Sequence, residues 1–272
     1  MLTNFALDQK SLSKLATKGL CAQSMQKQIN EEISLQLELW RAQGLSIIEQ
    51  NGYYFFETKF TKIEDATFCI VDIETNGSKP NKHQIIEIAA LKVKDAEIID
   101  RFESLVYCSE INAAITDLTG ITPEDTKDAP LLEKVISDFK IFLGDSIFVA
   151  HDVKFDYRFI SATLEKFGLA PLLNRSLCTL ALAQRTIVSY KYGLGYLNNF
   201  FHLNPDASHH RAMSDVITTY ELFKLTLQNL SKDIESVEDL IRFSREEKML
   251  KRPLIDPLLA VDEKKEESSL NS

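Results

Sequence analysis

Acidic side chains set in apolar surroundings are the residues of this 272-residue chain best suited to chemistry. Residues 68–77 read Phe-Cys-Ile-Val-Asp-Ile-Glu-Thr-Asn-Gly, an apolar run of strand length that ends in an Asn-Gly turn signal. Alternate side chains of a strand share a face, so Asp72 and Glu74 point the same way. Two like charges on a buried face are costly unless a hard divalent cation neutralises them. The alternative is a strand end whose carboxylates reach solvent.

A second acidic stretch, residues 150–160, follows a short apolar run that is typical of a central strand. Sheets flanked by helices usually place ligands after such strands. Asp152 is predicted to cap the helix that follows. Asp156 lies one turn further, where it is either a surface charge of the helix or a ligand.

A third stretch, residues 208–217, contains His210 and Asp215. On one continuous helix these two side chains would point about 140° apart. They share a site most easily if His210 lies in the loop before the helix and Asp215 in its first turns. A histidine beside acids could act as a general base, although a solvated loop is the simpler interpretation.

The elements that must position these residues follow from hydrophobic periodicity. Strands are expected from Phe68 onward and over 84–93, 98–107 and 146–150, and helices over 130–143, 153–167, 177–188, 193–201 and 211–229. Three strands with short links indicate an antiparallel meander. The later alternation of strand and helix predicts an α/β fold, with a mixed sheet flanked by helices, over residues 67–230.

Two further segments flank this domain. Residues 1–60 predict a small α+β unit of helices followed by a hairpin around Asn51-Gly52, an order that resembles a winged helix. Its acids and bases are balanced, which favours a docking or structural role over DNA binding. Residues 231–272 predict a helix over 237–249 and a disordered tail over 261–272.

Composition restricts the class of protein. The formal charge of −9 argues against broad, non-specific binding to nucleic acid, but it does not exclude a nuclease whose acidic site holds metal ions. The four cysteines are far apart and form no CxxC pair, so neither a zinc site nor a disulfide framework is indicated. We expect no membrane segment and a cytoplasmic location.

Taken together, the three motifs resemble the DEDDh exonuclease family, whose fold is ribonuclease H-like. They are Asp72-Ile-Glu-Thr, then His151-x-x-x-Phe-Asp156, then His210-Arg-Ala-x-x-Asp215. Residues 84–88, 119–122 and 177–181 resemble further family segments. The resemblance implies that Asp72, Glu74, Asp156 and Asp215 hold two divalent ions, Mg²⁺ or Mn²⁺, and that His210 deprotonates the attacking water.

The resemblance also implies substrate contacts. Thr75 and Asn76 are expected to touch the terminal nucleotide. Phe155 is expected either to contact the base of the terminal nucleotide or to pack in the protein core. His151 and Asp152 are expected at the edge of the substrate site. The family usually has Asn at the position of Asp152, so that contact departs from the family pattern.

The activity implied is removal of nucleotides from the 3′ end of single-stranded DNA, as in the proofreading epsilon subunit of bacterial DNA polymerase III. Residues 231–272 are then expected to bind the polymerase catalytic subunit. Residues 184–190 faintly resemble a peptide that binds the sliding clamp. The alternatives are a stand-alone exonuclease in DNA repair or RNA trimming, and a catalytically silent polymerase-binding module.

Overall fold

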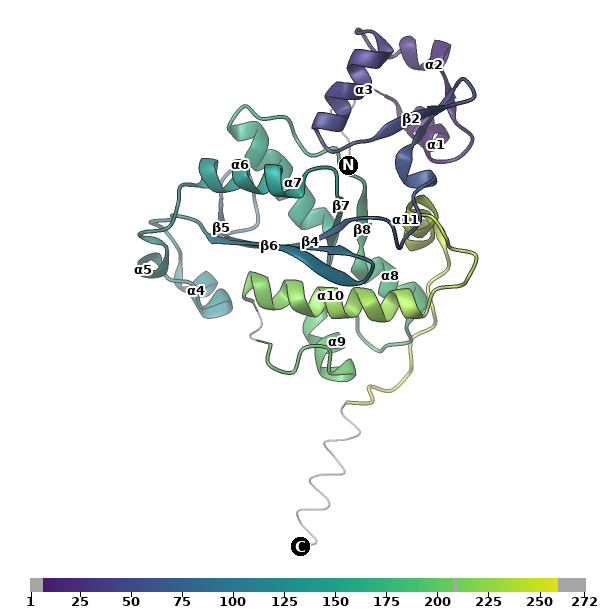
Figure 1. The fold of residues 1–272 in the computed structure, drawn as a ribbon. Helices are drawn as coiled ribbons and strands as arrows, with labels where there is room; N and C mark the ends of the chain where they lie inside the picture. Colours follow the sequence, from purple (N-terminus) through teal and green to yellow (C-terminus); the bar gives the residue numbers. More distant parts are fainter. Residues whose placement is uncertain (1–6, 208–209, 259–272) are drawn as a thin grey trace, which may run out of the picture.

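Five strands form the central sheet in the computed structural model, which describes residues 7–207 and 210–258 (Figure 1). Their order across the sheet is β6-β5-β4-β7-β8. The strands are β4 (Phe68–Thr75), β5 (Ile85–Lys94), β6 (Glu97–Leu105), β7 (Ile147–Ala150) and β8 (Ser176–Cys178). The first three pair antiparallel, and β7 and β8 continue the sheet in parallel with β4. The predicted meander and mixed sheet are therefore confirmed.

Helices cover both faces of the sheet (Figure 1). On one face, Val71 and Ile73 of β4 pack in a core with α6 (Leu132–Leu143) and α7 (Val153–Lys166). On the other, Phe68 and Ile70 pack with α8 (Thr179–Thr186), α10 (Ala212–Gln228) and α11 (Val237–Glu246). This alternation places Asp72 and Glu74 on the face that α10 covers. Helix α9 (Leu194–Phe201) packs against α10.

The predicted elements match the structure except where a segment is short. Strand β8 occupies the start of the helix expected over 177–188, because three residues are too few to show a period of two. Helix α4 (Ala113–Thr119) was not predicted. Helix α5 (Pro123–Thr126) begins at a capping box of Thr122 and Asp125, where the sequence indicates a helix start.

The N-terminal unit is the expected mixture of helices and a hairpin. It comprises α1 (Gln9–Ala16), β1 (Leu20–Cys21), α2 (Ala22–Gln26), α3 (Ile33–Ala42), β2 (Ile47–Gln50) and β3 (Tyr53–Phe56), followed by the 3-10 helix η1 (Glu57–Lys59). Asn51 and Gly52 both have positive φ, 53° and 79°, as a type I′ hairpin turn requires. Its sheet is antiparallel, in the order β1-β3-β2.

Helix α11 packs against the 3-10 helix η1, which follows the N-terminal unit, and against α8 and β8 of the main domain. Val237, Leu240 and Ile241 are buried in a core that also contains residues of α10, so Ile241 is not available for the contact with a polymerase that is expected of residues 231–272. The Glu238 carboxylate binds the Arg175 guanidinium and accepts a hydrogen bond from the Thr58 hydroxyl at 2.8 Å.

Other apolar residues of this segment stay exposed, namely Met249, Leu250, Leu254 and Ile255. The tail predicted to be disordered, residues 261–272, lies outside the described residues. In the part of the chain that the structure describes, no helix is both long and apolar enough to span a bilayer. All four cysteines are free, as expected.

Candidate active site

Strand β4 extends beyond its parallel neighbour, and this overhang carries the first acidic pair. Strand β7 pairs only with Phe68, Cys69 and Ile70 of β4, so the segment from Asp72 onward has an open edge. The chain leaves β7 at His151 and enters α7 beside that edge. The backbone N–H of Ile73 donates to the carboxylate of Asp156, in the first turn of α7. Asp156 is buried, with 4% of its surface exposed, so it is not a surface charge of the helix.

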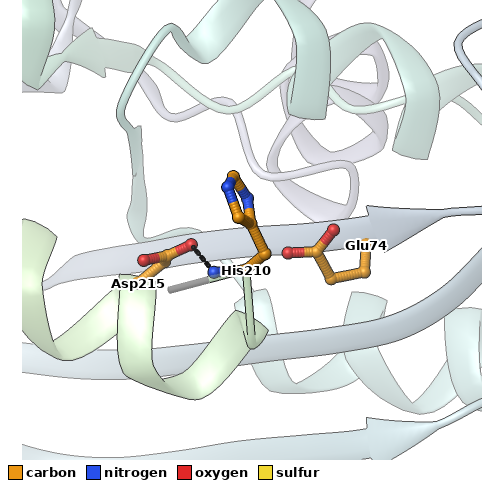
Figure 2. A group of neighbouring side chains, drawn as sticks. All are labelled: Glu74, His210 and Asp215. Atoms are coloured by element: carbon orange, nitrogen blue, oxygen red, sulfur yellow. Dashed lines mark hydrogen bonds between the residues drawn. The ribbon is translucent and has the colours of Figure 1, made fainter. Parts of the chain in front are cut away.

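The third motif reaches the same place from α10. His210 lies in the loop before this helix with φ of 61°, as the spacing predicts, and Asp215 lies in its first turn. The His210 backbone N–H donates to Asp215 Oδ2 at 3.2 Å (Figure 2). Glu74, His210 and Asp215 each offer a ligand atom within 4.8 Å of the others. Two segments about 140 residues apart in sequence therefore meet at one site.

Glu87 is a functional residue that the sequence reasoning missed. It stands directly opposite Glu74 on β5 and is 1% exposed. Its carboxylate accepts hydrogen bonds from the Arg211 guanidinium and from the Ala212 backbone N–H, both at 2.9 Å. It therefore holds the start of α10, which carries Asp215 and follows directly on the loop that carries His210. The available signal was an acid within the apolar run of residues 85–91, which a buried strand tolerates only when the charge is paired.

The site concentrates negative charge. Burial, and then the charges of Asp156 and Glu74, raises the pKa of Asp72 well above its ordinary value. Burial, followed by the Asp215 and Glu87 charges, raises the pKa of Glu74 to about 8. Burial also raises the pKa of Asp156 to about 7, although hydrogen bonds from backbone N–H groups oppose the shift. Without a cation the site holds protons near neutral pH.

The donor set fits hard divalent cations. Carboxylate oxygens dominate it, which suits Mg²⁺ and Mn²⁺ better than thiol-binding metals. A cation would also offset the repulsion between carboxylates that, after burial, raises the pKa of Asp72 and of Glu74. Asp72, Glu74, Asp156 and Asp215 come from β4, α7 and α10, so the fold brings together all four acids that the sequence predicts as ligands.

Of the two residues predicted to contact the terminal nucleotide, one is buried and the other is hydrogen-bonded within the protein. Thr75 is buried at the end of β4. The Asn76 side chain accepts a hydrogen bond from the Gln84 N–H at 2.8 Å and donates to the Glu110 carbonyl at 3.1 Å. Its amide therefore fixes the loop after β4 in this structure.

The residues around β7 and α7 have mixed roles. His151 bonds within the protein through both ring nitrogens, to the Thr179 hydroxyl at 3.0 Å and the Tyr192 carbonyl at 2.9 Å. Asp152 occupies the N-cap position of α7, but its side chain makes no capping bond, so that detail of the prediction is wrong. Its φ of 65° is a left-handed conformation that Asp and Asn both tolerate, so either residue suits this position. Phe155 is partly buried against the core, with its ring 5.7 Å from that of Phe159.

Comparisons with known proteins agree with this geometry. DNA polymerase III PolC-type of Staphylococcus haemolyticus is 38% identical over 172 residues, which cover 62% of this chain and 12% of that protein. The protein of the same name from Staphylococcus aureus is 37% identical over 188 residues, 68% of this chain and 13% of the relative. The chain thus spans about an eighth of the length of these relatives.

Solved structures of exonucleases share the fold. A structure of Exonuclease X in complex with 5′ overhanging duplex DNA has a TM-score of 0.50 and 26% identity, and the match covers 63% of this chain and 99% of that one. E. coli Exonuclease I in complex with a dT13 oligonucleotide has a TM-score of 0.55 and 17% identity, over 61% of this chain and 42% of that one. Residues 69–223 match the model of the family RNase_T, described as Exonuclease, and this chain therefore belongs to the exonuclease family.

Proposed function

We propose that this exonuclease removes nucleotides from the 3′ ends of DNA, with two divalent cations, Mg²⁺ or Mn²⁺, held by Asp72, Glu74, Asp156 and Asp215. The observation that carries the proposal is the convergence of these acids from three elements on one site. Glu74 and Asp215 offer ligand atoms within 4.8 Å of each other, and the charges of Asp156, Glu74 and Asp215 all act on Asp72. Bound cations would supply Lewis-acid chemistry at the scissile phosphate. Four carboxylates balance the charge of two such ions.

His210 acts as the general base in this proposal. Its side chain is exposed and stands on a loop, so it can reach a water beside Glu74 and Asp215. Its backbone is anchored to Asp215, which keeps the ring near the metal ligands. Glu87 positions this loop through Arg211 and Ala212 without touching the reacting atoms.

The first experiment measures release of mononucleotides from DNA strands labelled at the 5′ or the 3′ end, with Mg²⁺, with Mn²⁺ and with EDTA. Shortening from the 3′ end that requires the metal supports the proposal, and Asp72→Asn should abolish it. Asp233→Asn is the matched control, because Asp233 is an exposed aspartate on the α10–α11 connection. Wild-type activity in EDTA, or full activity of the Asp72 variant, would refute the proposed ligand set.

The biological setting that we propose is proofreading beside a replicative DNA polymerase III, in the manner of an epsilon subunit. Its support is the similarity of residues in this domain to a segment of PolC-type polymerases. Exposed Leu254 and Ile255, in residues 231–272, are the proposed contacts with the polymerase catalytic subunit. Truncation at residue 230 would uncover the core that α11 fills, so the sharper test replaces both residues by Ser and measures polymerase binding. Unchanged binding would contradict this contact.

A stand-alone exonuclease is the second candidate, and one observation favours it. The likeness to Exonuclease X extends over 99% of that protein. Retained activity on DNA without any measurable affinity for a polymerase would support this candidate, and faster hydrolysis of RNA would point to RNA trimming. The proposed clamp peptide has less support, because residues 184–186 end α8 and Ile187 is buried.

A further inference from the structure

A basic groove borders the candidate active site. It lies between the loop after β4, at residues 78–81, and one side of α7, and its volume is about 660 Å³. Lys79, Arg158 and Lys166 line it, and the remaining described lining residues are uncharged. All three cations are exposed. A local excess of positive charge is unusual on a chain whose formal charge is −9.

The groove is linked to the candidate metal site through the loop after β4 and through α7, which form its two walls. Its loop wall begins at Ser78, four residues after Glu74, so the two lie within about 14 Å of each other. Its helix wall belongs to α7, which also carries Asp156. Arg158, Ala162 and Lys166 recur every four residues and so form one stripe along the helix. From Arg158 to Lys166 this stripe is about 12 Å long, roughly the rise of three to four stacked nucleotides.

The loop wall is held in place before any ligand arrives. The His83 ring accepts a hydrogen bond from the Lys79 N–H at 3.1 Å, and the His83 N–H donates to the Lys79 carbonyl at 2.8 Å. Gly77 lies against the same ring, where an added Cβ would come within 2.6 Å of it. The bonds of Asn76 described above secure the start of this loop. Lys79 is therefore presented from a fixed backbone, which lowers the entropy lost on binding.

We propose that this groove binds the sugar-phosphate backbone of the substrate strand upstream of its 3′ end. The inference rests on the proposed function, because it assigns the path of the same substrate. Three separated cations among otherwise uncharged lining residues suit a chain of phosphates, and the absence of aromatic lining residues among those described predicts little preference for base sequence.

The experiment uses Arg158→Gln combined with Lys166→Gln in the full chain. The control is Lys232→Gln combined with Lys248→Gln, which removes the same charge from exposed positions outside the groove. Binding of a fluorescent single strand of about 12 nucleotides, long enough to cross the groove, is measured in EDTA at several salt concentrations. The groove variant should bind roughly threefold to thirtyfold more weakly, and its salt slope should fall by about 1.4, whereas the control should match the wild type.

Hydrolysis separates this inference from the proposed function. The nitrophenyl ester of thymidine monophosphate is too short to reach the groove, so the groove variant should hydrolyse it at the wild-type rate in Mn²⁺ and show a raised KM only for the long strand. Unchanged strand affinity and salt slope in the groove variant, or an equal change in the control, would overturn the groove assignment. Absence of hydrolysis by the wild type would instead refute the proposed function, and the binding result would still decide the groove.

Discussion

The charge of Glu74 should make the metal-free protein less stable as pH rises. Its pKa is about 8 in the folded chain against an ordinary value of 4.5. Between these values the folded state binds more protons than the unfolded state, so the free energy of unfolding falls with increasing pH. For this group alone the loss between pH 5 and pH 7 is at most about 2.5 kcal/mol. This loss of unfolding free energy is absent below pH 4 and complete above pH 8.

The variant that isolates this effect is Glu74→Gln, which keeps the shape and removes the charge. In EDTA at pH 7 it should be more stable than the wild type by up to about 3 kcal/mol, and at pH 5 by less than about 1 kcal/mol. Urea unfolding followed by circular dichroism at both pH values measures the difference. Glu31→Gln is the control, because Glu31 is an exposed glutamate in the N-terminal unit.

Added Mn²⁺ completes the test. A cation at 100 times its dissociation constant stabilises the wild type by about 2.7 kcal/mol, and it should stabilise the Glu74 variant much less. The reasoning is refuted if the variant gains no stability at pH 7 relative to pH 5, or if Mn²⁺ stabilises both proteins equally.

Three further predictions concern activity. Asp215→Asn should abolish nucleotide release and leave the fold intact, as checked by circular dichroism; normal turnover in Mg²⁺ would contradict its role as a ligand. His210→Gln should slow hydrolysis by about 10²- to 10⁴-fold with Mn²⁺ affinity unchanged, measured by single turnover and calorimetry; parallel loss of metal affinity would make His210 a ligand instead. Glu87→Gln should lower kcat more than it raises KM, because it loosens the start of α10, and an unchanged kcat would show that this contact does not position the site.

The sequence predicted which acids lie near one another better than it predicted the residues that hold them in place. Asp72 stands in an apolar run, where a charge is costly unless it is neutralised, and the order of Asp72, Asp156 and Asp215 along the chain matches a family pattern. The structure added Glu87, because a partner such as Arg211, more than a hundred residues away, cannot be inferred from local spacing. Hydrogen bonds to residues outside the local turn also occupy the Asn76 side chain. A turn residue that looks free in sequence proved to hold its own loop.

Local sequence patterns failed to predict an element where it was short, and failed to predict its burial where it packs against elements far away in sequence. Strand β8 has three residues and can be recognised as a strand only by its pairing with β7. The helix at residues 237–246 was predicted, but its burial was not, because the hydrophobic surface that covers Ile241 comes from elements far away in sequence. Amphipathic periodicity shows that a helix has an apolar face, and it does not show which partner covers it.

The assembly of the site from β4, α7 and α10 has a consequence during protein synthesis. Asp215 leaves the ribosome about 140 residues after Asp72, which corresponds to roughly 7–30 s of translation. The meander of β4, β5 and β6 can form within that interval, because its strands are neighbours in sequence. The nascent chain still lacks Asp215 and His210, the proposed last metal ligand and the proposed general base, so a partly made or interrupted product could not carry out the proposed hydrolysis. The proposed chemistry therefore requires that nearly the whole domain has been made and folded.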